Sequence, residues 1–163
     1  MNPHDILKYG HTFLHGAFDG VPMSEWETEG VCGIWSTKDI LSHLTSYELM
    51  LEEILTGFVQ EGGDTPVLTE MFTLPPDEFN ASQVGQRKGK SPQQVLQELD
   101  DTHARVRKLV GQLAPEKWRE NGTLPWYGDE YSLDDFIAYS FYGHKREHGA
   151  QINIFKDSLK AGG

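Results

Sequence analysis

Residues 36–58, with the sequence STKDILSHLTSYELMLEEILTGF, contain the clearest helix signal of the chain. Ser36 can accept hydrogen bonds from the free backbone N–H groups of the first turn, and Asp39 places a carboxylate at the positive end of the helix dipole. The side chains that follow at three- and four-residue spacing form one largely apolar stripe. The stripe consists of Ile40, His43, Leu44, Tyr47, Leu51, Ile54, Leu55 and Phe58. We therefore predict an amphipathic helix that carries His43 on its buried face.

Three further helices are expected from the same kind of spacing. These segments are residues 3–19, 91–113 and 132–159. Ser91 is suited to cap the second of them, and the third is expected to start at Ser132, with Asp134 and Asp135 in its first turn. No segment shows the period-two alternation that a sheet requires. Four helices with one apolar stripe each predict an all-α four-helix bundle, formed by residues 1–163 as a single domain.

Residues 59–90 form a connection of unusual length for a compact domain. The segment is polar and rich in glycine, proline and acidic residues. We expect it to carry the chain back along the bundle, with a short helix near residues 77–86, so that the second and third long helices run parallel. Residues 23–34 are expected to form a loop beside two hydrophobic anchors, Trp26 and Trp35.

The charge and composition narrow the classes of function. The chain has 25 acidic against 14 basic residues and a net charge of −11. A surface of this sign repels phosphate backbones, so nucleic acid is not expected as a partner. No stretch approaches the roughly 18 to 20 apolar residues of a membrane span, and the N-terminal residues lack a signal-peptide core, so a cytoplasmic protein is expected. Cys32 is the single cysteine, which excludes an internal disulfide and a cysteine-rich zinc motif.

Histidines provide the most specific functional signal. His144 and His148 are four residues apart and lie on one face of the last helix, where two imidazoles can converge on one metal ion. His43 offers a third imidazole from another buried stripe. Three such ligands leave coordination positions open for water or substrate, as catalytic metals require. Packing of three core histidines without a metal is the alternative.

The remaining histidines are interpreted differently. His11 and His15 form a second pair at four-residue spacing, but they lie off the apolar stripe of their helix. His103 lies on a buried stripe, and we expect it to be a core histidine that is hydrogen-bonded to a neighbour.

Two segments resemble the DinB-like superfamily. Residues 33–44, GIWSTKDILSHL, resemble its second helix, where a Trp-Ser-x-Lys-Asp-x-x-x-His-Leu run is common. Residues 143–152, GHKREHGAQI, resemble its last helix with His-x-x-x-His and a following Gln-Ile. The resemblance implies an up-down-down-up bundle, a nickel, zinc or iron ion on His43, His144 and His148, and a homodimer. Relatives of this kind include transferases that use low-molecular-weight thiols.

The sequence supports two functional hypotheses. The first is a metal-dependent enzyme that acts on a small molecule, either a hydrolase or a thiol-dependent S-transferase. Tyr47 is the candidate catalytic helper, and the candidate substrate contacts are Trp126, Tyr127, Arg87 and Lys88. The second hypothesis is a non-catalytic stress or resistance protein that binds a metal or a small molecule. Core packing and a solvated basic loop explain these helper residues equally well.

Overall fold

The computed structural model describes residues 2–163 and consists of helices joined by loops, with no strand in that range. The four long helices are α1 (Pro3–Phe18), α2 (Thr37–Val59), α5 (Pro92–Val110) and α8 (His144–Ala161). The shorter elements are η1 (Met23–Glu25), α3 (Pro66–Thr73), α4 (Pro76–Gly85), α6 (Pro115–Arg119), α7 (Leu133–Ile137) and the π-helix η2 (Ala138–Gly143). The all-α class predicted from the sequence is confirmed.

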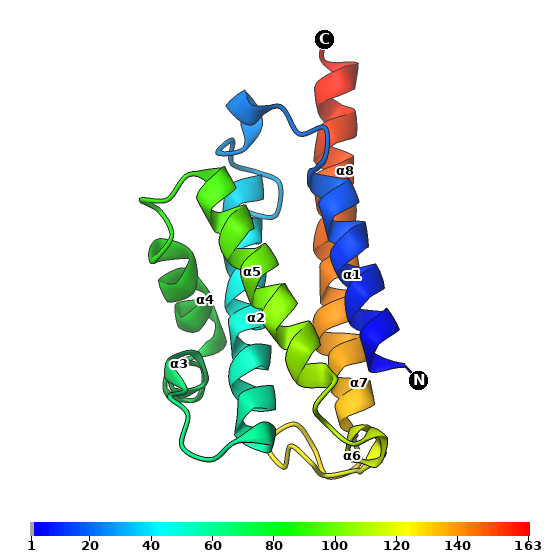
Figure 1. Ribbon diagram of the computed structural model, residues 1–163. Helices are drawn as coiled ribbons and strands as arrows, with labels where there is room; N and C mark the ends of the chain where they lie inside the picture. Colours follow the sequence, from blue (N-terminus) through cyan, green and yellow to red (C-terminus); the bar gives the residue numbers. More distant parts are fainter. Residues whose placement is uncertain (1) are drawn as a thin grey trace.

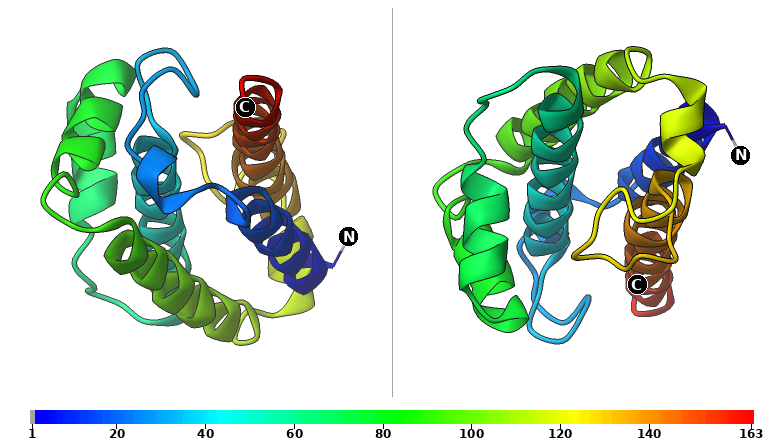
Figure 2. Two further views of the ribbon diagram at one scale, coloured as in Figure 1. Left: turned by 90° about the horizontal axis from the view of Figure 1, so that it is seen from above. Right: turned by 90° about the horizontal axis from the view of Figure 1, so that it is seen from below.

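The long helices pack in two pairs, α1 with α8 and α2 with α5. Figure 1 shows α1 and α8 running towards the top of the view, while α2 and α5 run towards the bottom. The chain passes from the end of α2 through α3 and α4 before it enters α5. Both views of Figure 2 show α3 and α4 outside α2, on the side away from α1 and α8.

Serine caps determine where α2, α5 and α7 begin. Ser36 accepts a hydrogen bond from the backbone N–H of Asp39, and the Asp39 carboxylate accepts one from the backbone N–H of Ser36. Ser91 and Ser132 form the same reciprocal capping box at the other two helices. The caps predicted at Ser36 and Ser91 are therefore confirmed, and a helix begins at the expected position after Ser132.

The connection between α2 and α5 contains one more helix than the sequence predicted. The expected short helix corresponds to α4, whereas α3 was not predicted. Thr65 provides no side-chain cap for α3. Instead, the Glu53 carboxylate of α2 accepts hydrogen bonds from the backbone N–H groups of Val67 and Leu68, at 3.0 and 2.9 Å. Because this cap comes from a different helix, local sequence did not reveal it.

The last predicted helix is also more complex than expected. Residues 132–159 were predicted as one continuous helix, but α7 and α8 are separated by the π-helical residues of η2. A π-helical turn accommodates an extra residue and changes the face on which the following side chains lie. Further along, Gly149 lets α8 approach α1, because a Cβ at this position would overlap the ring of Phe13.

A layer of buried polar side chains divides the core into two apolar clusters. One cluster contains residues from the end of α1 and the beginnings of α2 and α5, including Leu14, Ile40 and Leu99. The other contains residues from the opposite ends of these helices, including Leu7 and Leu51. The buried polar residues between them on α2, α5 and α8 are Thr45, Ser46, Glu48, Thr102, His103 and Lys145.

Glu48 is the centre of this polar layer and is fully buried. It accepts a hydrogen bond from Lys145 Nζ at 2.7 Å, and its other carboxylate oxygen lies 2.7 Å from His103 Nδ1. Burial alone would raise the pKa of Glu48. The charge of Lys145 and the hydrogen bond with His103 outweigh that effect and hold the pKa at about 2. The expectation that His103 is a core histidine bonded to a neighbour is confirmed.

We expect Glu48→Gln to lower the free energy of unfolding by about 3 kcal/mol, because it leaves the buried Lys145 ammonium without a charged partner. Urea unfolding at neutral pH measures the change. Glu52→Gln is the matched control, because Glu52 binds the exposed Arg105 and such a pair contributes less than about 1 kcal/mol. Equal losses in the two variants would contradict the assignment of Glu48 as the centre of the layer.

Candidate metal centre

His43, His144 and His148 converge on one point in the structure. His144 Nε2 lies 2.9 Å from His43 Nε2 and 3.0 Å from His148 Nε2. A metal ion bonded to each nitrogen at about 2.1 Å would place ligands at right angles about 3.0 Å apart. The three imidazoles therefore already have the spacing of ligands on one side of a metal ion.

The helices bring these imidazoles together from two sides. His43 follows the Ser36 cap by two helical turns on α2, while His144 and His148 occupy the first two turns of α8. The π-helix η2 ends at Gly143, immediately before His144. The backbone carbonyl of Ser140, within η2, accepts a hydrogen bond from the His144 ring. The irregular turn thus orients a histidine of the cluster directly.

Two of the three outer ring nitrogens, those of His144 and His148, have their own acceptors. His148 Nδ1 lies 2.8 Å from Oε1 of Gln151, which is a suitable acceptor for an Nδ1–H group. His43 Nδ1, in contrast, is buried without a hydrogen-bond partner among residues 2–163, although Asn80 of α4 lies near this ring. The contacts of His144 and His148 hold protons on their outer nitrogens and leave their Nε2 lone pairs directed at the centre of the cluster. Three converging lone pairs repel each other unless a cation or a proton lies between them.

Burial keeps these imidazoles neutral. It lowers the pKa of His43 to about 3 and that of His144 to about 4, and repulsion between the neighbouring imidazoles adds to both shifts. Burial also lowers the pKa of His148. Imidazole binds metals in its neutral form, so protons compete for these nitrogens only at a pH well below that of free imidazole.

Aromatic rings surround the cluster. The Trp35 ring lies 4.8 Å from His43 and 6.4 Å from His148, while Tyr47 lies 4.9 Å from His43 and 4.7 Å from His144, measured between ring centroids. Burial raises the pKa of the Tyr47 phenol, so at neutral pH it is a hydrogen-bond donor. Trp35 also lines a cleft of about 190 Å³, together with Ile34, Asp39, Ala81, Val84 and Lys88.

The two basic residues predicted to contact substrate have different surroundings. Arg87 is buried, and its guanidinium binds the Glu98 carboxylate at 2.8 Å and the Gln83 carbonyl at 3.0 Å. Lys88 is 65% exposed, lies in the cleft beside Trp35 and pairs with Asp39 at 2.9 Å. Lys88 is therefore available to a ligand in this cleft, whereas Arg87 holds the end of α4 against α5.

The two predicted aromatic contacts, Trp126 and Tyr127, lie in the loop before α7. Their rings contact Phe72 of α3, Tyr131 and Phe136. In the range 2–163, these ring contacts do not extend to the three histidines. The structure thus groups Tyr47 and Trp35 with the histidines and places Trp126 and Tyr127 in a separate aromatic group.

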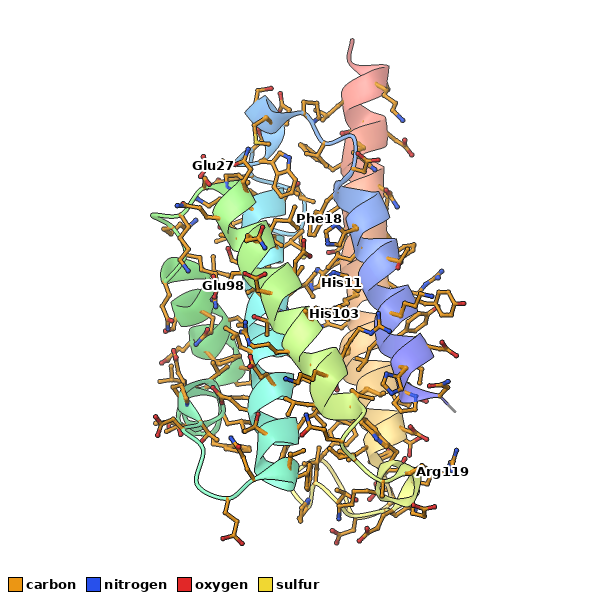
Figure 3. All side chains as sticks on the ribbon, in the orientation of Figure 1. His11, Phe18, Glu27, Glu98, His103 and Arg119 are labelled. Atoms are coloured by element: carbon orange, nitrogen blue, oxygen red, sulfur yellow. The ribbon has the colours of Figure 1, made fainter. Side chains whose placement is uncertain are left out.

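A second group of possible ligands lies between α1 and α5. His11, His15 and Asp100 bring two imidazoles and a carboxylate within 4.8 Å of one another. Figure 3 shows His11 beside His103 in the same region. The sequence identified the histidine pair but not Asp100, because nothing in its local pattern distinguishes it from the other acids of α5. The contact of Gln151 with His148 could have been predicted from the sequence, because Gln151 lies about one helical turn after His148.

Without metal, we expect the protein to lose stability as the pH falls below about 6.5. The unfolded chain then takes up protons on histidines that the folded chain keeps neutral, so the equilibrium shifts towards unfolding. His43→Gln removes one such site and should flatten this dependence by about 1.4 kcal/mol per pH unit. Urea titrations of the metal-free protein at several pH values measure the slope. An unchanged slope in the variant would contradict the burial of a neutral His43.

Comparison with known proteins agrees with the geometry of this cluster. A family model described as the DinB superfamily matches residues 10–152, which include all three histidines. Comparison with curated proteins and with solved structures gave no significant match. No helix in the described part of the chain is long and apolar enough to cross a membrane. The match covers most of the chain, which belongs to the DinB superfamily.

Proposed function

We propose that this protein is a divalent-metal-dependent enzyme that acts on a small molecule, with His43, His144 and His148 as the metal ligands. The observation that carries the proposal is the convergence of three neutral Nε2 atoms, with neighbouring atoms 2.9 and 3.0 Å apart. In this interpretation α1, α2, α5 and α8 form an up-down-down-up bundle, in one domain, with the ion between α2 and α8. A homodimer is proposed from the family resemblance.

The donor set fits a zinc, nickel or iron ion. Imidazole nitrogen suits all three metals, and three protein ligands leave positions open for water or substrate. When bound, such an ion lowers the pKa of a coordinated water or thiol and so supplies a nucleophile at neutral pH. Gln151 and the Ser140 carbonyl support this role by accepting hydrogen bonds from the outer nitrogens of His148 and His144.

The residues around the ligands suggest how a substrate is held. Tyr47 offers a phenol hydroxyl next to His43 and His144, where it can donate a hydrogen bond to a substrate oxygen. Trp35 provides an apolar wall shared by the histidines and the cleft that contains Lys88. The Lys88 ammonium can attract an anionic group, such as the carboxylate of a thiol cofactor. Trp126 and Tyr127 are proposed to contact a larger substrate from the neighbouring loop.

A non-catalytic binding protein is the second candidate. The same open coordination positions can hold a drug, toxin or metal ligand without turnover. The exposure of the acid that is nearest to the ligands along the chain favours this candidate in one respect. Glu147 is the acid nearest to the ligands in the sequence. It is exposed to solvent, so it does not lie where a general base for a metal-bound substrate would be needed.

We expect the purified wild-type protein to bind one more equivalent of zinc or nickel than either His43→Ala or His148→Ala. Each substitution removes one of three ligands and leaves two, which should weaken binding at least tenfold. Elemental analysis after dialysis measures the stoichiometry, and circular dichroism shows whether each variant is folded. His4→Ala, on α1 outside the cluster, is the matched control. Folded variants that retain the wild-type metal content would refute the site.

A reaction panel separates the enzyme from the binder. The metal-loaded protein is assayed with a low-molecular-weight thiol plus an electrophile, and separately with esters and amides. For the transferase, Lys88→Gln should raise the KM for the thiol about tenfold with little change in kcat, which corresponds to the loss of one charged contact. Lys90→Gln is the control, because Lys90 pairs with Glu98. An unaltered KM would remove Lys88 from the proposal, and silence in both panels would favour the binder.

A further inference from the structure

The cluster of His11, His15 and Asp100 lies between α1 and α5, apart from the three histidines of the candidate metal centre. Asp100 Oδ1 lies 2.6 Å from His15 Nε2 and 3.1 Å from His11 Nε2. The two imidazoles are one turn apart on α1, and the carboxylate comes from α5. Three donor atoms from two helices therefore meet at one point on the outside of the bundle.

Their positions match the requirements of a transition-metal ion. Ligands at right angles around an ion with bonds of about 2.1 Å lie about 3.0 Å apart, close to the 3.1 Å between Asp100 Oδ1 and His11 Nε2. The 2.6 Å contact of Asp100 with His15 Nε2 is a hydrogen bond, which lengthens by a few tenths of an ångström when an ion replaces its proton. Two imidazoles and one carboxylate are a donor set that zinc, nickel and iron accept. The side chains of His11, His15 and Asp100 are 17, 36 and 38% exposed, so water can reach the remaining coordination positions.

The interior of the protein holds His11 in position. Its ring stacks on His103, with centroids 3.8 Å apart and planes inclined by 3°. His103 in turn contacts the buried Glu48, so the imidazole rests on the polar layer of the core. His11 Nδ1 is buried without a partner among residues 2–163, so the polar contacts of this ring are made through Nε2. Burial, followed by the charges of His103 and Lys145, lowers the pKa of His11 to about 3 and keeps the ring neutral.

The charge around Asp100 also favours a cation. In the described part of the chain, the ion-pair partners of Asp100 are these two histidines. No lysine or arginine pairs with this carboxylate in that range. The net charge of −11 adds a general attraction for cations.

We propose that His11, His15 and Asp100 form a second site for a divalent transition-metal ion, which links α1 to α5 and is independent of the first. The ion binds the two Nε2 atoms and the carboxylate, and water fills the other positions. Because this ion connects two helices only in the folded chain, its binding stabilises the fold. The inference does not rest on the proposed enzymatic function.

The test uses a parent variant in which the first site is disabled by His43→Gln and His148→Gln. Equilibrium dialysis against zinc, followed by elemental analysis, measures the metal bound by the folded parent. We expect the parent to bind one equivalent of zinc. Asp100→Asn in the parent should weaken zinc binding at least tenfold, whereas Asp101→Asn should leave it unchanged. Asp101 is the matched control, because it is an exposed neighbour on the same helix. Zinc should also raise the Tm of the parent but not that of the Asp100→Asn variant.

Two results would overturn the second site. One is a folded parent that binds no zinc, and the other is equal binding by the Asp100→Asn and Asp101→Asn variants. If the parent does not fold, Asp100→Asn and His15→Gln are introduced into the wild-type chain instead. Each should lose one equivalent of zinc while the first site keeps its own, and wild-type stoichiometry in both would refute the proposal. If only the first site is wrong, the missing equivalent of zinc is the one that depends on His43 and His148. The equivalent that depends on Asp100 and His15 is then still bound.

Discussion

The buried contact between Glu48 and Lys145 is the interaction on which the middle of the bundle depends. A fully buried carboxylate is tolerated because an ammonium and an imidazole satisfy it. This arrangement joins α2, α5 and α8 at the level where the apolar core is interrupted. The ion pair and the hydrogen bond offset the free-energy cost of burying these charges, and they fix the relative positions of the three helices. Lys145 is also the direct neighbour of His144 in the sequence.

Both histidine clusters lie at the edges of this polar layer. On one side, His144 and His148 of α8 face His43 of α2. On the other side, His11 of α1 stacks on His103, which contacts Glu48. Imidazoles that bind metals need neutral rings with defined orientation, and a rigid, partly desolvated layer supplies both. Both histidine clusters therefore lie in partly desolvated surroundings next to buried polar groups.

The short elements between the long helices place further groups around the histidines. The π-helix η2 brings the Ser140 carbonyl to His144, and α4 brings Asn80 near His43. Glu53 of α2 caps α3 and so anchors the long connection that carries α4. The cleft beside Trp35 is formed where this connection meets the loop before α2.

Local sequence was enough to predict α1, α2 and α5, most of α8, the serine caps of α2 and α5, and the histidines of the first cluster. These features depend on local hydrogen bonds and on periodic burial, which neighbouring residues encode. The packing of the folded chain was needed to reveal the cap of α3, the π-helical turn, the burial of Arg87 and the meeting of Asp100 with His11 and His15. Each of these depends on groups from distant segments, whose distances and burial are set by packing and leave no local pattern. The same packing lowers the pKa values of His11, His43 and His144, which identical residues would not show in an unfolded chain.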